Sequence, residues 1–304
     1  MTTTTVRKGR AALAGCIAGI ALLTACGGGD AGGGSSPLAS RAPADVAREA
    51  PDITRAAGTS RYVAEMTYST TGGPLGDETW TSSGTGTYDY AHQIGDGRFT
   101  TDDARFPVPP QETVFRNNVL YQRDVGASRW QKIDFSQLVN TPVGQHDPSE
   151  QLDLLRGVSE DVREAGTAEV RGDEVTRYAI TIDPQRLATA SGVVVDGGLV
   201  QAALQAAGPM PGQVFVDSDG RVRRLEVSME SNGADLAAAP EMSRMLGDNP
   251  ELQKMLQDRR TTSQISVEYF DFGIPVTAQE PDPSQVDSGP AIPRVPGVPD
   301  LPGN

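Results

Sequence analysis

Apolar and polar residues alternate with a period of two along much of this sequence. Successive side chains of a β-strand point to opposite faces of a sheet, so this period predicts strands with one apolar face. The clearest case is the segment 213–230, where the turn sequence Asp-Ser-Asp-Gly at 217–220 separates two alternating runs. We therefore expect a β-hairpin there. Its apolar positions are Val214, Val216, Leu225, Val227 and Met229.

Six further segments have the same strand character. In one of them Tyr62, Met66 and Tyr68 share a face, and in another Ile180 and Ile182 do. The others are short or rich in β-branched and aromatic residues, which favour strands. The predicted strands cover residues 61–69, 80–90, 119–123, 130–133, 174–183 and 265–272.

Three segments show helical spacing, and a fourth is rich in alanine and leucine. The first contains Pro51, which must begin or interrupt a helix. Since strands outnumber helices, the sequence predicts an α+β fold in which an antiparallel sheet carries helices on one side. The helical segments are 44–57, 149–158, 242–256 and 185–207.

A basic start and a short apolar run open the chain. The first ten residues hold three basic side chains and no acid, and residues 11–23 are too few to span a bilayer. This form is typical of a secretory signal peptide. The segment Leu23-Thr24-Ala25-Cys26-Gly27 follows and resembles the lipobox of bacterial lipoproteins. The resemblance implies a signal peptide over residues 1–25 and lipidation of Cys26.

A lipid on Cys26 would fix where the protein works. Two acyl chains hold a protein stably on a bilayer, at about 0.8 kcal/mol for each buried methylene. We therefore expect the membrane to be a partner through this anchor, with the protein on the extracytoplasmic face of the cell membrane. Residues 26–43 are rich in glycine and serine and predict a flexible tether.

The C-terminal segment is dense in proline. Seven prolines occur in residues 279–304, a density that favours extended, open chain. We predict a disordered tail there. The folded domain is then expected to cover residues 44–278, a length that suits a single domain.

Charge and residue usage exclude several classes of function. The net charge is −14 and becomes more negative when the basic leader is removed, so the surface should repel nucleic acid. His92 and His146 have no cysteine or regularly spaced ligands beside them, so no metal site is predicted. No nucleophile with a matching base occurs, and we expect a protein without catalytic residues or cofactors. The basic group Arg221, Arg223 and Arg224 could meet a lipid headgroup or occupy ordinary strand positions.

Several local patterns occur in a fixed order behind the lipobox. They run from Asn118-Val119-Leu120-Tyr121 and Trp130-Gln131-Lys132-Ile133, through the 213–230 hairpin, to Tyr269-Phe270-Asp271-Phe272-Gly273. In this order they resemble the LppX/LprG type of actinobacterial lipoprotein and, more distantly, the LolA and LolB carriers. The resemblance spans residues 45–278.

This resemblance implies a fold and a class of ligand. The expected fold is a strongly curved antiparallel sheet, a half-open β-barrel, with helices covering its concave side. An apolar cavity between sheet and helices would hold the acyl chains of a lipid or glycolipid, which the protein would bind and carry at the cell envelope. The candidate ligand-binding residues are Tyr62, Met66, Tyr68, Ile180, Ile182, Leu225, Val227 and Met229.

Two further hypotheses accompany this one. Methionine adapts to varied apolar shapes, so Met242, Met245 and Met255 could form a lid over the cavity or simply pack an amphipathic helix on the sheet. The domain could alternatively be a solid, ligand-free interaction module that scaffolds or regulates another envelope protein. An apolar patch on its outside would then make the contact.

Overall fold

The computed structural model divides the chain into two units, Met1–Ser36 and Pro37–Asn304, and every element described below belongs to the second. The structure describes residues 40–72, 76–103, 107–117, 119–134, 148–191, 207–238, 247 and 249–287. The predicted signal peptide, Cys26, most of the tether, Met242 and Met245 lie outside these residues.

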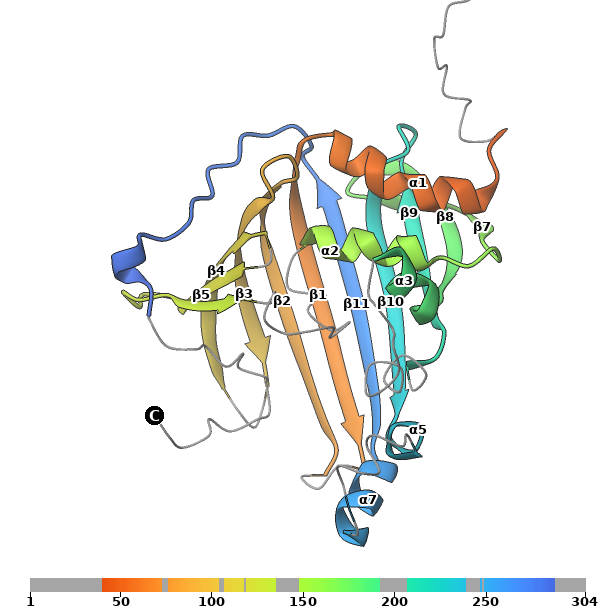
Figure 1. The fold of residues 1–304 in the computed structure, drawn as a ribbon. Helices are drawn as coiled ribbons and strands as arrows, with labels where there is room; N and C mark the ends of the chain where they lie inside the picture. The colour runs from red at the N-terminus through yellow and green to blue at the C-terminus, as the bar shows by residue number, and fades with distance from the viewer. Residues whose placement is uncertain are drawn as a thin grey trace, which may run out of the picture. The chain divides into compact units, whose positions relative to one another are not determined.

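One antiparallel sheet of eleven strands forms the body of this unit (Figure 1). Its order is β6-β5-β4-β3-β2-β1-β11-β10-β9-β8-β7, so the first and last strands pair at its centre. The strands are β1 Thr59–Thr71, β2 Glu78–Asp89, β3 Ile94–Asp102, β4 Val108–Arg116, β5 Val119–Asp124, β6 Gln131–Asp134, β7 Arg163–Val170, β8 Asp173–Ile182, β9 Met210–Val216, β10 Val222–Asn232 and β11 Arg260–Phe270.

The sheet is open. Strands β6 and β7 are its two edges, and the sheet is neither closed nor strongly curled. The predicted α+β class and antiparallel sheet are confirmed, whereas the strongly curved half-open barrel is wrong. Its eleven strands lie side by side in one order, and no pairing joins β6 to β7.

Three helices lie over one face of the sheet, which we call the inner face (Figure 1). They are α1 Pro43–Ala56, α2 Pro148–Asp153, which the 3₁₀ turn η3 Leu154–Gly157 extends, and α3 Pro184–Ala190. Two short helices, α5 Gly233–Ala238 and α7 Pro250–Gln257, lie where β10 ends and β11 begins, and η4 Pro283–Gln285 lies near the C-terminus. The predicted helices at 44–57 and 149–158 are therefore confirmed.

Local chemistry explains where these helices begin and how they are fixed. Proline at the first position begins α1 and α3, as its fixed φ allows. The Asp183 carboxylate caps α3 by accepting two backbone N–H bonds. Thr54 of α1 accepts a bond from the backbone N–H of Val222, and the hydroxyl of Tyr269 donates to the carbonyl of Pro148. These last two bonds fasten α1 and α2 to the sheet.

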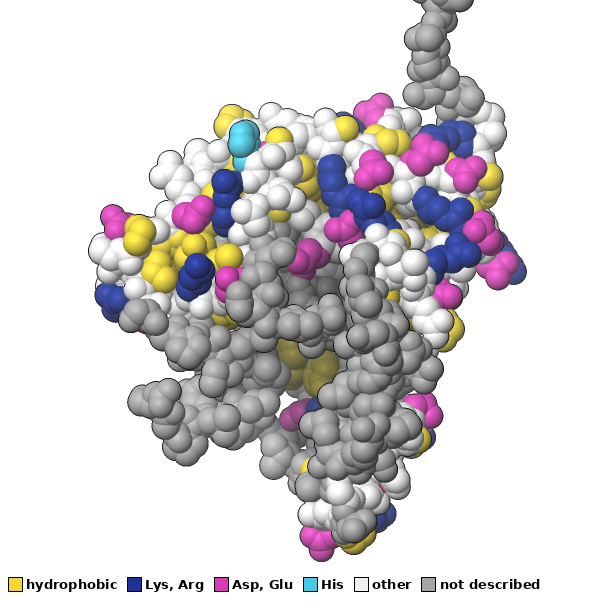
Figure 2. Space-filling model, viewed as in Figure 1, with side chains coloured by type: hydrophobic (Ala, Val, Ile, Leu, Met, Phe, Trp, Pro, Cys, Tyr) yellow, Lys and Arg dark blue, Asp and Glu magenta, His cyan; other side chains and the backbone are white. Residues whose placement is uncertain are grey.

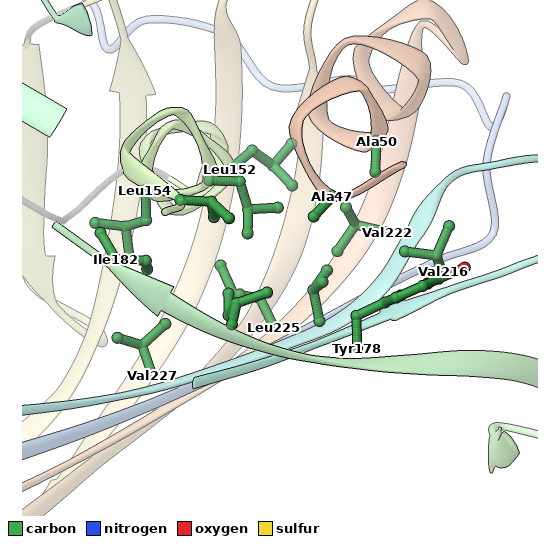
Figure 3. Packing of buried hydrophobic residues seen from close by; sticks show 14 of the residues in the cluster. Ala47, Ala50, Leu152, Leu154, Tyr178, Ile182, Val216, Val222, Leu225 and Val227 are labelled. Atoms are coloured by element: carbon green, nitrogen blue, oxygen red, sulfur yellow. The ribbon is translucent and has the colours of Figure 1, made fainter. Parts of the chain in front are cut away.

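The main core lies between the helices and the inner face. Ala47 and Ala50 of α1 and Leu152 of α2 pack against strand residues such as Val222 and Leu225 (Figure 3). All five side chains are fully buried. Burying apolar surface contributes about 25 cal/mol per Å², so this layer stabilises the attachment of the helices.

Strands β3 and β4 are not predicted by the sequence pattern. Glycines interrupt β3, and two exposed prolines, Pro109 and Pro110, follow the first residue of β4. The glycines are required because rings lie over them. A Cβ on Gly95 would lie 2.5 Å from Cδ2 of Tyr88, and one on Gly97 would lie 2.3 Å from the Tyr62 hydroxyl oxygen.

The chain beyond residue 278 continues along the sheet. Trp130 donates its backbone N–H to the carbonyl of Gln285 at 2.8 Å, and Asp287 donates to the carbonyl of Trp130 at 2.8 Å. Tyr121 donates its hydroxyl to a Glu280 oxygen at 3.1 Å. The segment 280–287 therefore covers the apolar cluster of Val114, Tyr121 and Trp130, and the folded unit extends past the predicted boundary.

Candidate ligand-binding face

The predicted ligand-binding residues share the inner face. In the register of the sheet Tyr62 lies opposite Tyr269, and Met66 lies opposite Ile265, which in turn lies opposite Val227. The same alternation holds along each strand, so the other predicted side chains face the same way. They come from β1, β8 and β10, which are distant in sequence.

Most of these residues are packed core. Tyr62, Ile180, Ile182, Leu225 and Val227 are at most 4% exposed and belong to the cluster beneath the helices. The hydroxyl of Tyr62 donates to the carbonyl of Asp96 at 2.9 Å, and this bond fixes the position of the ring on the inner face. A ligand would have to displace the helices to reach them.

The other three predicted residues lie nearer the far end of the strands. Met66, Tyr68 and Met229 are half-buried, and the two methionines pack against the edge of the core. In Figure 1 this end of β1, β10 and β11 extends past α1, α2 and α3 towards α5 and α7. Among the predicted residues, these three therefore lie outside the core that α1, α2 and α3 cover.

Two aromatic residues of the inner face were not selected from the sequence. Trp80 lies opposite Tyr68 on β2, and the rings stack with centroids 5.2 Å apart. Phe99 of β3 packs against the core beside Tyr62, with ring centroids 6.5 Å apart. The alternation within the predicted strand 80–90 could have placed Trp80 on this face, but β3 gave no signal for Phe99.

Polar groups follow the apolar residues at the end of the face. The Arg259 guanidinium donates to the hydroxyl oxygen of Tyr68 at 3.1 Å, and the hydroxyls of Thr70 and Thr261 lie 3.4 Å apart. Burial alone would raise the pKa of Tyr68, but hydrogen bonds from Thr70 and Thr261 and the charge of Arg259 lower it below its ordinary value. One cation, Arg259, therefore lies beside the hydroxyl groups at the end of the face.

A groove of about 400 Å³ lies on the opposite, outer face. Most of its lining residues alternate in sequence with the inner residues, and most of its side chains are polar, so it offers little apolar surface to acyl chains. The groove is lined by Glu65, Thr67, Pro211, Gly212, Gln213, Glu226, Val227, Ser228, Gln264, Ile265 and Ser266.

The basic residues of the 221–224 segment are engaged in ion pairs. Arg221 contacts Asp217 at 2.9 Å, and Arg223 contacts Asp173 at 2.6 Å and the carbonyl of Tyr269. Arg224 pairs with Glu268. These contacts hold the hairpin and its neighbours together, which leaves little reason to assign the three arginines to a headgroup.

The helix side carries mixed charge. Figure 2 shows basic and acidic side chains interspersed over α1 and α3. Arg48 and Arg186 both pair with Glu160, at 2.8 and 3.0 Å, and these pairs lower the pKa of that carboxylate. Arg55 contacts Asp153 at 2.8 Å. This surface therefore presents no large field of one sign.

Other kinds of site have no support in the described residues. No group of three or more His, Cys, Asp or Glu side chains there could hold a metal ion. His92 contacts Asp89 at 2.8 Å in an exposed turn. Among the helices that the structure describes, none is long and apolar enough to cross a membrane. Met255, a predicted lid residue, is 36% exposed on α7.

Comparison with known proteins gives structural matches only. No protein-family model and no curated protein matches the chain. The chain is similar to the lipoprotein LppX of Mycobacterium tuberculosis, with a TM-score of 0.44 and 14% identity over 78% of this chain and 98% of that one. It is also similar to LprF of Mycobacterium bovis, with a TM-score of 0.44 and 12% identity over 81% and 99%.

A more distant match completes the comparison. A LolA superfamily protein of Nitrosomonas europaea has a TM-score of 0.26 and 9% identity, over 76% of this chain and 93% of that one. The chain thus has structural matches to LppX and LprF lipoproteins and to LolA superfamily proteins over most of its length.

Proposed function

We propose that this protein is a lipid-anchored, non-enzymatic binding protein that carries a hydrophobic ligand, a lipid or glycolipid, at the cell envelope. The observation that carries the proposal is the apolar strip on the inner face beyond the packed core. Met66, Tyr68 and Met229, all half-buried, line this strip, and the buried ring of Trp80 stacks on Tyr68. It continues the apolar core towards the end of the strands that α1, α2 and α3 do not cover.

The strip suits acyl chains for physical reasons. Each methylene moved from water into apolar surroundings contributes about 0.8 kcal/mol, so a long chain would gain several kcal/mol along the strip. Methionine side chains adapt to chains of different shape, and the flat ring of Tyr68, held by its stacking on Trp80, adds contact area. The anchor would keep such a carrier at the membrane from which it takes its ligand.

The location rests on the N-terminal sequence. The lipobox-like segment at Cys26 would place a diacylglyceryl anchor on the mature chain, and the tether to residue 43 would let the sheet stand away from the bilayer. Radiolabelled palmitate should enter the wild-type protein and not the Cys26→Ser variant. Equal labelling of both would contradict the anchor.

The alternative, a ligand-free interaction module, needs an apolar patch on the outside. In the part of the chain that the structure describes, the exposed large apolar residues are Val125, in the turn after β5, and Met255, on α7. Single exposed apolar residues are normal on a protein surface. The described surface therefore favours the carrier over the interaction module.

A binding experiment tests the carrier function. The full chain with Cys26→Ser is titrated with Nile red, a neutral dye that fluoresces in apolar sites. Met66→Glu places a charge on the strip and should weaken dye binding at least tenfold. Thr67→Glu adds the same charge one residue away on the outer face and should leave binding within about twofold.

Two controls keep the result interpretable. Far-UV circular dichroism checks that each variant folds, and Met229→Glu with Ser228→Glu repeats the comparison on β10. Equal loss of binding in the inner and outer variants, or no binding by the parent chain, would refute the proposed function.

A further inference from the structure

The side chains of the inner face become polar towards the α5 and α7 end of the sheet. On β1 the side chains pass from Tyr62, Ala64 and Met66 to Tyr68 and Thr70. On β11 they pass from Val267 and Ile265 to Ser263 and Thr261, and on β10 from Val227 and Met229 to Ser231. The register places Thr70 opposite Thr261 and Thr261 opposite Ser231, so hydroxyl groups from three strands meet in one row.

A cation lies beside this row. Arg259 immediately precedes β11, and its side chain reaches the inner face, where Nη2 contacts the hydroxyl oxygen of Tyr68 at 3.1 Å. Arg259 is only partly exposed. In the described ranges no carboxylate forms an ion pair with it, whereas Arg116, Arg129, Arg171 and Arg224 each contact an acid.

These groups complement an anion. The guanidinium supplies several N–H donors with a fixed geometry that suits carboxylate and phosphate oxygens. The hydroxyl of Tyr68 accepts a bond from Arg259, and the hydroxyls of Thr70 and Thr261 are also its hydrogen-bond partners. A charged oxygen bound here would receive bonds from the guanidinium and, once the Tyr68 hydroxyl turns towards it, from Tyr68, in a partly buried place where charge-assisted bonds are stronger than in water.

We infer that the ligand is an anionic amphiphile whose headgroup, a carboxylate or a phosphate, binds Arg259 and Tyr68. Its acyl chain then runs along the inner face past Met66 and Met229, where the strip is apolar. This inference rests on the proposed function and names the class of ligand and its orientation. The headgroup lies at the α5 and α7 end of the strands (Figure 1).

Three probes with one chain length distinguish the contribution of the headgroup to binding from that of the acyl chain. Dodecanoate, dodecyl phosphate and dodecanol each displace Nile red from the full chain with Cys26→Ser, below their micelle concentrations. The parent chain should bind at least one of the two anions about tenfold or more tightly than the alcohol. This preference should fall with added salt, because the interaction is partly exposed.

Substitutions assign the preference to a residue. Arg259→Gln should weaken binding of the preferred anion by roughly ten- to hundred-fold, as expected for the loss of a hydrogen bond to a charged group. Binding of dodecanol should stay within about twofold. Arg260→Gln is the matched control, since it removes the same charge from the next, exposed residue. Tyr68→Phe keeps the ring on Trp80, removes the hydroxyl and should weaken anion binding several-fold, which provides a second test if Arg259→Gln does not fold.

The outcomes separate the two proposals. Binding of all three probes with equal affinity, or equal effects of Arg259→Gln and Arg260→Gln, would overturn the headgroup site and leave the carrier function standing. Failure of the parent chain to bind any probe or the dye would overturn both.

Discussion

Tyr62 and Gly97 give a sharp test of how the inner face is built. A Cβ on Gly97 would lie 2.3 Å from the Tyr62 hydroxyl oxygen, 2.8 Å from Cε2 of Phe99 and 3.0 Å from Oγ1 of Thr113. Overpacking of this kind costs about 1–3 kcal/mol, offset by roughly 0.4–1 kcal/mol because alanine restricts the unfolded chain. We expect Gly97→Ala to lower the free energy of unfolding by about 1–2 kcal/mol.

The same contact predicts a strong coupling between the two residues. Tyr62→Phe alone loses the hydrogen bond to Asp96, at a cost of about 1 kcal/mol. In the Tyr62→Phe background the shortest contact of the new methyl group is gone and the 2.8 Å contact with Phe99 remains, so Gly97→Ala should then cost less. The double variant should be more stable than the sum of the single effects by about 1 kcal/mol or more.

Urea denaturation of the four proteins measures this coupling, with comparable slopes required for each. Gly86→Ala is the matched control: its Cβ would lie 2.6 Å from the same hydroxyl but also 1.9 Å from the backbone carbonyl oxygen of Asp96, which cannot move aside. Tyr62→Phe should therefore rescue Gly97→Ala and not Gly86→Ala. Additive effects for Gly97→Ala within about 0.5 kcal/mol would refute the packing of Tyr62 described here.

Three shorter predictions concern other parts of the fold. Deleting residues 280–304 should expose Trp130, now 8% exposed, and shift tryptophan emission to the red, whereas deleting 288–304 should not; equal shifts would refute the described contact. Asp183→Ala should lower stability by about 1 kcal/mol and Asp183→Asn by much less in thermal unfolding, because asparagine still caps α3; equal losses would contradict the cap. Burial alone would raise the pKa of Glu268, but its hydrogen bonds and charge interactions with Arg224 and Arg171 outweigh burial and lower the pKa below its ordinary value. The folded form therefore favours the charged carboxylate, so Glu268→Gln should cost stability above pH of about 4.3 and lose its effect as pH falls through the lower folded pKa; a cost that does not change with pH would contradict this.

The strands with clean alternation were predictable. In β1, β8 and the β9–β10 hairpin, the face identified from the sequence is the one that packs under the helices, because a buried face admits only one register of apolar positions. Strand β3 was not predictable, since its Gly95 and Gly97 remove the alternation. The side chains of Tyr88 and Tyr62 pack directly against these two glycines. This is a contact between strands, so no local sequence pattern indicates it.

The candidate site was predictable in part. The sequence indicated which side chains share a face, but not which of them the helices would cover, so Tyr62, Ile182 and Leu225 prove to be core. The role of Arg259 depends on its distance to Tyr68, which is 191 positions away in sequence. The contact of residues 280–287 with Trp130 was hidden for a similar reason, because proline density describes only the local chain.

Native mass spectrometry of the Cys26→Ser chain, purified gently from a bacterial envelope fraction, tests the central claim most directly. The carrier function predicts bound species of lipid mass that are lost in Met66→Glu and retained in Thr67→Glu. A clean ligand-free mass, under conditions that keep lipid on a known carrier, would contradict it.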